Sequence, residues 1–164
     1  MKFKGPLILF ILAALGLQAQ DHKFQSLFVY NFAKYIEWPS SKQQGDFVIG
    51  IVGGSAAVTQ FKNVLEGKTK GTQKIVVQSI SSPSAYANCH MIFVTAEHNN
   101  VISKITAAVG QEPILIVTEK EGALKDGSSI NMVIKNGKMA FEINEQLKNS
   151  KLKVSSEVMR LAQS

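Results

Sequence analysis

The chain has 164 residues, of which 45% are hydrophobic and 18% charged, and its formal net charge is +6. That length suits one compact domain that buries a core without disulfides, and the single cysteine excludes an intrachain disulfide. The lysines are scattered rather than gathered in one patch, so the composition does not favour a nucleic-acid-binding protein.

Residues 1–19 have the pattern of a secretory signal peptide. Lys2 and Lys4 precede an apolar run over residues 6–17, and Ala19 supplies a small residue for cleavage. The apolar run is too short to span a bilayer, and a retained anchor would need a longer one. The sequence therefore predicts an exported protein whose mature form has lost two lysines, which lowers the formal charge from +6 to +4.

The stretch from Phe24 to Pro39, FQSLFVYNFAKYIEWP, predicts an amphipathic helix. On a helical wheel its apolar side chains share one side: Phe24, Leu27, Phe28, Phe32, Tyr35, Ile36 and Trp38. Pro39 lacks an N–H group and pushes Trp38 out of helical dihedrals, so the helix should end at this step. Asn31 lies within the apolar side, where a buried amide would need hydrogen-bond partners.

The middle of the chain alternates short apolar, β-branched runs with helical patterns. The expected strands are Phe47–Val52, Lys74–Ile80, Met91–Thr95 and Ile114–Thr118. Helical spacing follows the first strand from Ser55, an N-cap candidate, and follows the third strand from Asn99 or Asn100. This order predicts a mostly parallel, twisted sheet with helices on both faces.

The last third of the chain predicts an antiparallel β-hairpin. Residues 129–135 and 138–143 flank Asn136-Gly137, a dipeptide that suits a two-residue hairpin turn. A short helix is expected over Glu157–Ala162. The expected fold class is therefore α/β, a three-layer sandwich with a C-terminal hairpin, in a single domain spanning residues 23–162.

A candidate ligand turn, Gly53-Gly54-Ser55, lies between the first strand and its helix. Glycines allow close approach of the backbone, and a helix N-terminus attracts anions. However, the spacing G-x-x-G-G departs from the dinucleotide fingerprint, and no acidic residue ends the next strand. A structural tight turn and a small-ligand site both remain open.

Metal and catalytic signals are weak, so we expect no metal, no cofactor and no enzyme. The candidate metal ligands are His22, Cys89, His90 and His98. Cys89 and His90 are adjacent and should point to opposite faces of a strand, without a second cysteine nearby. The apolar run that follows favours a buried, inert Cys89, and the alternative is an intermolecular bridge. No nucleophile elbow is present, and the carboxylates are dispersed.

Three motifs, in order, resemble the YfiR family. They are FVYNFAKYIEWP over residues 28–39, NCHMIFVT over residues 88–95, and INMVIKNGKMAFEIN over residues 130–144 leading to LKVSSEVMRLA over residues 152–162. The resemblance implies a periplasmic regulator with a Rossmann-like α/β sandwich, typically dimeric. Such a protein represses a membrane-bound diguanylate cyclase through its periplasmic sensor region, and so lowers cyclic-di-GMP and biofilm formation.

The resemblance also suggests where a partner binds. In the family, the C-terminal hairpin and the segment after it are linked with partner contact, and the matching residues here are Phe141, Glu142, Ile143 and Asn144. Phe141 and Ile143 could equally form a core face. Trp38-Pro39 is a second candidate, either as an exposed patch or as a closure of the core. Family members commonly carry disulfides, whereas only Cys89 is present here. Regulation of a sensor histidine kinase and binding of a small ligand are the alternative functions.

Overall fold

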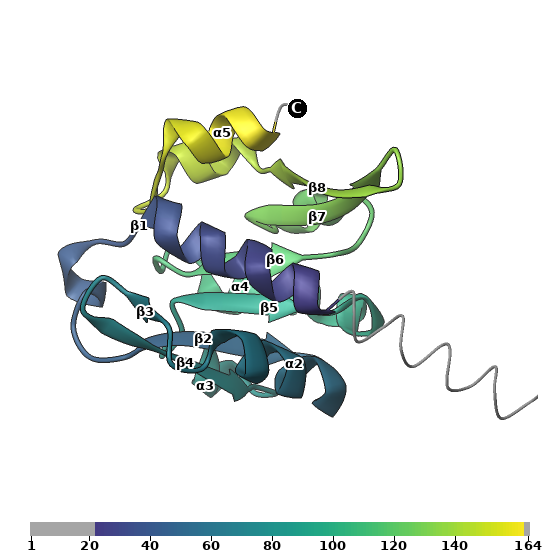
Figure 1. Ribbon diagram of the computed structural model, residues 1–164. Coiled ribbons are helices and arrows are strands. Elements are labelled where there is room, and N and C mark those ends of the chain that lie inside the picture. The colour runs from purple at the N-terminus through teal and green to yellow at the C-terminus, as the bar shows by residue number, and fades with distance from the viewer. Residues whose placement is uncertain (1–21, 163–164) are drawn as a thin grey trace, which may run out of the picture.

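The computed structural model describes residues 22–162, which form a seven-stranded sheet with helices on both faces (Figure 1). The sheet contains β2 (Phe47–Val52), β3 (Thr69–Lys70), β4 (Gln73–Ser79), β5 (Met91–Val94), β6 (Leu115–Thr118), β7 (Ile130–Lys135) and β8 (Lys138–Ile143). A separate antiparallel pair joins β1 (Ile36–Glu37) to β9 (Lys153–Val154). The signal peptide predicted at residues 1–19 lies outside the described residues.

The helices follow the chain order of the expected elements. A helix over residues 22–35 begins the described fold. The others are α2 (Ser55–Leu65), α3 (Pro83–Tyr86), α4 (Ile102–Val109) and α5 (Ser156–Ala162). Short 3-10 turns are η1 (Ser40–Lys42), η2 (Ala96–Val101), η3 (Ala123–Asp126) and η4 (Glu145–Asn149).

The sheet is mostly parallel, with the order β3-β4-β2-β5-β6-β7-β8. The five strands from β4 to β7 run parallel to one another, and the two edge strands, β3 and β8, are antiparallel to their neighbours. Every residue of β5 and β6 is buried. Continuous apolar runs such as MIFV suit these positions because parallel strands are covered on both faces.

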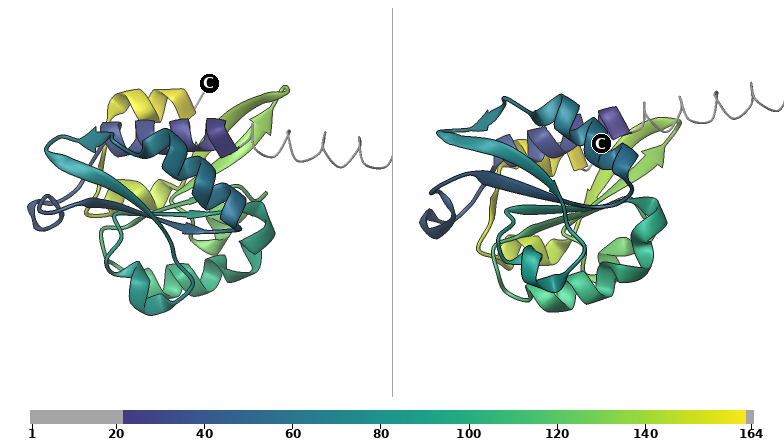
Figure 2. Two further views of the ribbon diagram at one scale, coloured as in Figure 1. Left: turned by 60° about the horizontal axis from the view of Figure 1, so that its bottom comes forward. Right: turned by 90° about the horizontal axis from the view of Figure 1, so that it is seen from below.

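Two hydrophobic clusters lie on the two faces of the sheet. On one face, the 22–35 helix, α2 and α5 cover Ile49, Phe93 and Phe141. On the other face, α3, α4 and η3 cover Ile92 and Ile116. Figure 2 shows these helices above and below the sheet, with the 22–35 helix between α2 and α5.

The first helix differs from its prediction in length and rotation. It ends at residue 35, because Ile36 and Glu37 pair with β9 and the chain is already extended before it reaches Pro39. Its buried side chains are Gln25, Ser26, Val29, Phe32 and Ala33. The prediction that Asn31 is buried is wrong, since Asn31 is exposed. The buried side of the helix is therefore rotated away from the predicted one.

The turn between β7 and β8 contains Asn136 and Gly137. Their φ angles are 51° and 72°, which place both in the left-handed region. Asparagine and glycine are the residues that accept this conformation in a two-residue hairpin turn. Six residues of each strand are thereby paired in register, from Ile130 opposite Ile143 to Lys135 opposite Lys138.

Candidate functional site

Phe141, the first residue of the candidate partner segment, is part of the core. It is 5% exposed, and its ring lies 4.9 Å from that of Phe32 and 6.1 Å from that of Phe28, edge-on in both cases. Ile143, two residues on, is half-buried against the same cluster. The side chain of Phe141 is therefore buried in the core, which is the alternative to partner contact that the sequence leaves open for it.

Trp38 is also a core residue rather than an exposed patch. It is 3% exposed, its Nε1–H donates to the carbonyl oxygen of His90 at 3.2 Å, and its ring stands perpendicular to Phe47 at 4.8 Å. The indole turns inward because the chain leaves the helix before Trp38 is reached. Pro39, the next residue, is half-buried.

His90 is held by two backbone groups that determine its tautomer. Its Nδ1 accepts from the Val48 N–H at 3.1 Å, so Nε2 carries the proton and donates to the Lys42 carbonyl at 2.8 Å. Burial lowers the pKa of the imidazole below its usual range. One ring nitrogen thus anchors the 38–45 connection and the other is bonded to β2, which leaves neither of them for a metal.

Cys89 lies on the opposite side of the sheet from His90. It is fully buried in the cluster with Ile92 and Ile105, and its Sγ lies 3.4 Å from the Ala85 carbonyl oxygen. Burial raises the pKa of the thiol, which favours the protonated form over the reactive thiolate. These observations agree with the prediction of a buried cysteine.

Asn144 secures the end of the hairpin. Its Oδ1 accepts from the Gln146 N–H at 3.0 Å and thereby caps η4. Its Nδ2 donates to the carbonyl oxygens of Leu124 at 3.1 Å and Ser128 at 3.0 Å. The amide is therefore occupied by internal hydrogen bonds, although Asn144 also borders a cavity.

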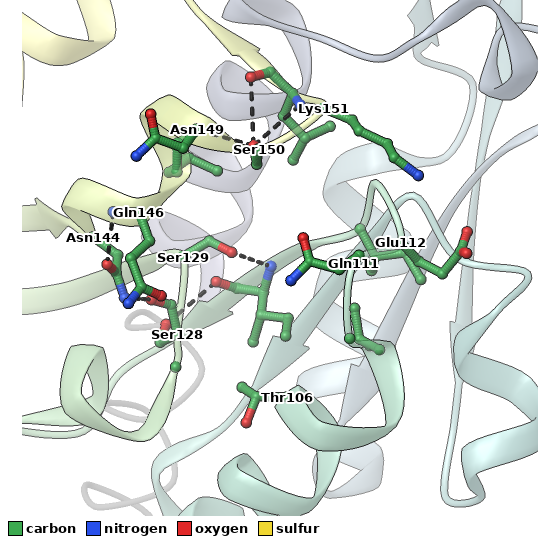
Figure 3. A pocket seen from close by; sticks show the side chains of 17 residues that line it. Thr106, Gln111, Glu112, Ser128, Ser129, Asn144, Gln146, Asn149, Ser150 and Lys151 are labelled. Carbon is green, nitrogen blue, oxygen red and sulfur yellow. Dashed lines mark hydrogen bonds between the residues drawn. The ribbon is translucent and has the colours of Figure 1, made fainter.

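That cavity has a volume of about 430 Å³ and is lined by residues at the starts of β6 and β7, among them Ile114 and Ser129. Figure 3 shows its polar side chains. Asn144 and Gln146 line one side of it, and Gln111 and Glu112 line the other. Further amide and hydroxyl groups come from Ser128, Ser129, Asn149 and Ser150. A lining of this kind can hold a small molecule that donates and accepts several hydrogen bonds.

A second groove, of about 520 Å³, lies between the start of the 22–35 helix and the hairpin. It brings Glu142 together with Glu119 and Glu121. The Glu119 carboxylate accepts from the Ala96 N–H at 2.7 Å and from the side-chain amide of Gln25. Burial raises the pKa of Glu119 above its usual range. The groove is acidic and has apolar side chains, among them Met132 and Met139, in its lining.

Gly53-Gly54-Ser55 lies at the carboxyl end of β2 and lines neither of these cavities, nor a third of about 200 Å³ beside Trp38. Gly54, rather than the predicted Ser55, is the N-cap of α2. A Cβ atom on Gly53 would come within 2.5 Å of the Thr95 side chain, whereas one on Gly54 would meet nothing within 4 Å. Close packing against Thr95, the residue after β5, therefore explains the glycine at position 53.

Matched serine substitutions separate these two glycines. Gly53→Ser should lower the free energy of unfolding by about 1–3 kcal/mol, because the new side chain overpacks against Thr95. Gly54→Ser should change it by less than about 0.5 kcal/mol, since serine is a favourable N-cap. Urea unfolding of both variants measures the difference, and equal losses would contradict the packing explanation.

Neither a metal centre nor a membrane span is present among residues 22–162. No group of three or more His, Cys, Asp or Glu side chains there could hold a metal ion, and no helix there is long and apolar enough to cross a bilayer. The described features define a mixed α/β domain with a mostly parallel sheet and polar grooves at its periphery.

The chain belongs to the YfiR/HmsC-like family, whose model matches residues 22–163. No curated protein matches the chain. Members of this family are periplasmic and regulatory rather than catalytic, and they act in diguanylate cyclase signalling through a partner with a periplasmic sensor. The match covers the whole of the described fold, so the family assignment applies to the entire domain.

Proposed function

We propose that this protein is a non-enzymatic periplasmic repressor of a membrane-bound diguanylate cyclase. It binds the periplasmic sensor region of the cyclase and so lowers cyclic-di-GMP and biofilm output. The observation that carries the proposal is the family match across residues 22–163. A repressor of this kind needs a different affinity for two states of its partner, and that difference requires no catalytic group.

The partner surface that we propose centres on the outer edge of the hairpin. β8 ends the sheet, so one side of its backbone has no strand neighbour within residues 22–162. Glu142 and Ile143 on β8 are half-buried, and Glu142 borders the acidic groove. Asn144 contributes by holding the backbone that follows β8, through its hydrogen bonds to the Leu124 and Ser128 carbonyl oxygens. A homodimer would be non-covalent in this scheme, because Cys89 is fully buried.

Complementation of a deletion strain tests the proposal. Deleting the gene should raise cyclic-di-GMP several-fold, and the wild-type gene should restore the low level. Glu142→Arg should fail to restore it, whereas Glu66→Arg, an exposed charge reversal at the end of α2, should succeed. Thermal unfolding of both variants checks that they are folded. An unchanged cyclic-di-GMP level after deletion, in a strain that encodes a cyclase, would contradict repression.

The alternative within the same class is regulation of a sensor histidine kinase. A crosslinking pull-down from the native envelope separates the two, because it identifies the membrane partner directly. Recovery of a kinase without a cyclase would favour the alternative.

A small-ligand-binding role is the second candidate, and the cavity of about 430 Å³ with its amide and hydroxyl lining favours it. A thermal-shift screen with amino acids, sugars and nucleotides tests this role. A true ligand should raise the melting temperature of the wild type, and Gln111→Leu should reduce that shift. A ligand that instead loses its effect in Gly54→Val would point to the glycine turn.

A further inference from the structure

The outer side of the 22–35 helix carries an apolar stripe that nothing in the described fold covers. At 100° per residue, positions 24, 27, 31 and 35 fall on one face. Phe24 is 47% exposed, Leu27 39% and Tyr35 37%, and Asn31 between them is also exposed. Three large apolar side chains aligned along one helix differ from the single exposed residues that are normal on a protein surface.

Lysines border this stripe on one side. Lys23 and Lys34 are exposed, and the Lys34 ammonium lies 5.7 Å from the ring centres of both Tyr30 and Tyr35. Lys68, from the loop after α2, adds a third ammonium 5.1 Å from the Tyr30 ring. The helix contains no Asp or Glu between residues 22 and 35. The stripe is therefore both apolar and basic.

The other border of the stripe is formed by α5, which lies beside the 22–35 helix in both views of the fold (Figures 1 and 2). The two helices are joined through the β1–β9 pair, and the Ser155 N–H donates to the Tyr35 carbonyl at 3.2 Å. α5 adds an exposed Leu161, and its two exposed charges, Glu157 and Arg160, are of opposite sign. The apolar character thus extends over two neighbouring helices on one face of the molecule, whereas the basic character comes from Lys23, Lys34 and Lys68 beside the first helix.

Charge decides what this surface can bind. If two copies met through antiparallel 22–35 helices, equivalent flanks would adjoin, and Lys23 of one copy would approach Lys34 of the other. The repulsion between these two like charges opposes such a contact. An anionic surface instead satisfies the lysines while the apolar side chains leave water. Helices that lie in a membrane interface have this composition, with aromatic and apolar side chains such as Phe, Leu and Tyr on one side and lysines beside them.

We propose that this face docks on anionic phospholipid headgroups, with Phe24, Leu27 and Tyr35 inserted at the boundary of the acyl chains. The inference is independent of the partner proposed above, since it concerns the lipid surface and not the cyclase. Docking of this kind would keep the domain at the membrane in which a membrane-bound partner resides. The interaction is peripheral, because a single amphipathic helix of this length lies along the interface rather than across it.

Vesicle co-sedimentation of the protein purified from the periplasmic fraction tests the proposal. Binding to phosphatidylglycerol-containing vesicles should exceed binding to pure phosphatidylcholine vesicles by at least tenfold, and it should weaken in high salt. The double variant Phe24→Ser/Leu27→Ser should lose roughly tenfold or more. Lys23→Gln/Lys34→Gln should lose roughly 25-fold, because each lysine near an anionic surface contributes roughly fivefold.

Matched variants control for charge and for folding. Lys104→Gln/Lys125→Gln removes two charges from α4 and η3 on the opposite face and should retain wild-type binding. Phe24→Leu/Leu27→Ile keeps the apolar stripe and should also bind. Every variant carries the same N-terminus, so differences between them arise from the stripe alone. Thermal unfolding checks that each one is folded.

Three results would overturn the proposal. The first is absence of binding to anionic vesicles, and the second is equal binding to anionic and neutral ones. The third is a homodimer that Phe24→Ser/Leu27→Ser dissociates, without any vesicle binding, which would assign the face to a second copy. Because the measurement contains no cyclase, failure of lipid docking leaves the cyclic-di-GMP result unaffected.

Discussion

Replacing Phe141 with alanine should lower the free energy of unfolding by about 3–5 kcal/mol. The ring is buried between Phe28 and Phe32 from the first helix, and both contacts are edge-on. Its loss leaves a cavity between the hairpin and the helix that covers it, and the surrounding side chains can fill this cavity only in part. Urea unfolding followed by far-UV circular dichroism measures the change.

The matched control is Ile134→Ala on the same hairpin. Ile134 is 68% exposed, so its truncation should change stability by less than about 0.5 kcal/mol. A loss below about 1 kcal/mol for Phe141→Ala would contradict the packing role. These stability measurements also help to interpret the cyclic-di-GMP assay. A Phe141 variant that fails to repress will fail because it is unstable, whereas Glu142→Arg tests the proposed contact with the partner.

The order and type of the six longer sheet strands, β2 and β4 to β8, were predictable because the local sequence pattern and the tertiary packing favour the same structure there, whereas the two-residue edge strand β3 was expected as a loop. The apolar runs over β2, β5 and β6 are continuous, as buried parallel strands require. At the turn of the last two strands, Asn136-Gly137 combines a propensity for left-handed dihedrals with flanking strand patterns. Where local propensity, hydrophobic pattern and packing all favour the same structure, that structure can be predicted from the sequence.

The first helix was harder to predict because its environment decides which side is buried. Its apolar residues outnumber the positions on one face, so periodicity alone permits more than one rotation. The pairing of Ile36 with Val154 ends the helix early, and packing on the sheet then selects Val29, Phe32 and Ala33. Phe24 and Leu27 are left outside, and they form the surface from which we infer lipid docking.

The acidic groove could not be predicted from sequence spacing. Gln25 and Glu119 are 94 positions apart in the chain, yet their side chains are hydrogen-bonded. Gln25 comes from the helix and Glu119 from the residue after β6, so the contact exists only once the helix has docked on the sheet. Similarly, nothing local indicates that Asn144 caps η4 while holding two carbonyl groups of the preceding loop.

Acid should destabilise the fold through His90. Its pKa is lowered in the folded state from an ordinary value of 6.5, so the unfolded chain binds a proton more readily. The stabilising effect of the neutral imidazole is therefore fully present above about pH 6.5 and is lost as the pH falls below it. The loss reaches at most about 1.4 kcal/mol per pH unit, until the folded-state pKa is passed. Protonation at Nδ1 also removes the hydrogen bond from the Val48 N–H.

The fluorescence of Trp38, the only tryptophan, reports this transition because its indole donates to the His90 carbonyl. His90→Asn can keep an acceptor for the Val48 N–H without a titrating ring, so its stability should be lower at pH 7 but flatter between pH 7 and 5. Glu119 acts in the opposite sense, since its raised pKa means that protonation favours the folded state as the pH falls. Subtracting the variant's free energy of unfolding from that of the wild type at each pH cancels the Glu119 contribution. If this difference in the free energy of unfolding does not change with pH, His90 has the same pKa in the folded and unfolded states. Any loss of stability in acid then comes from other groups.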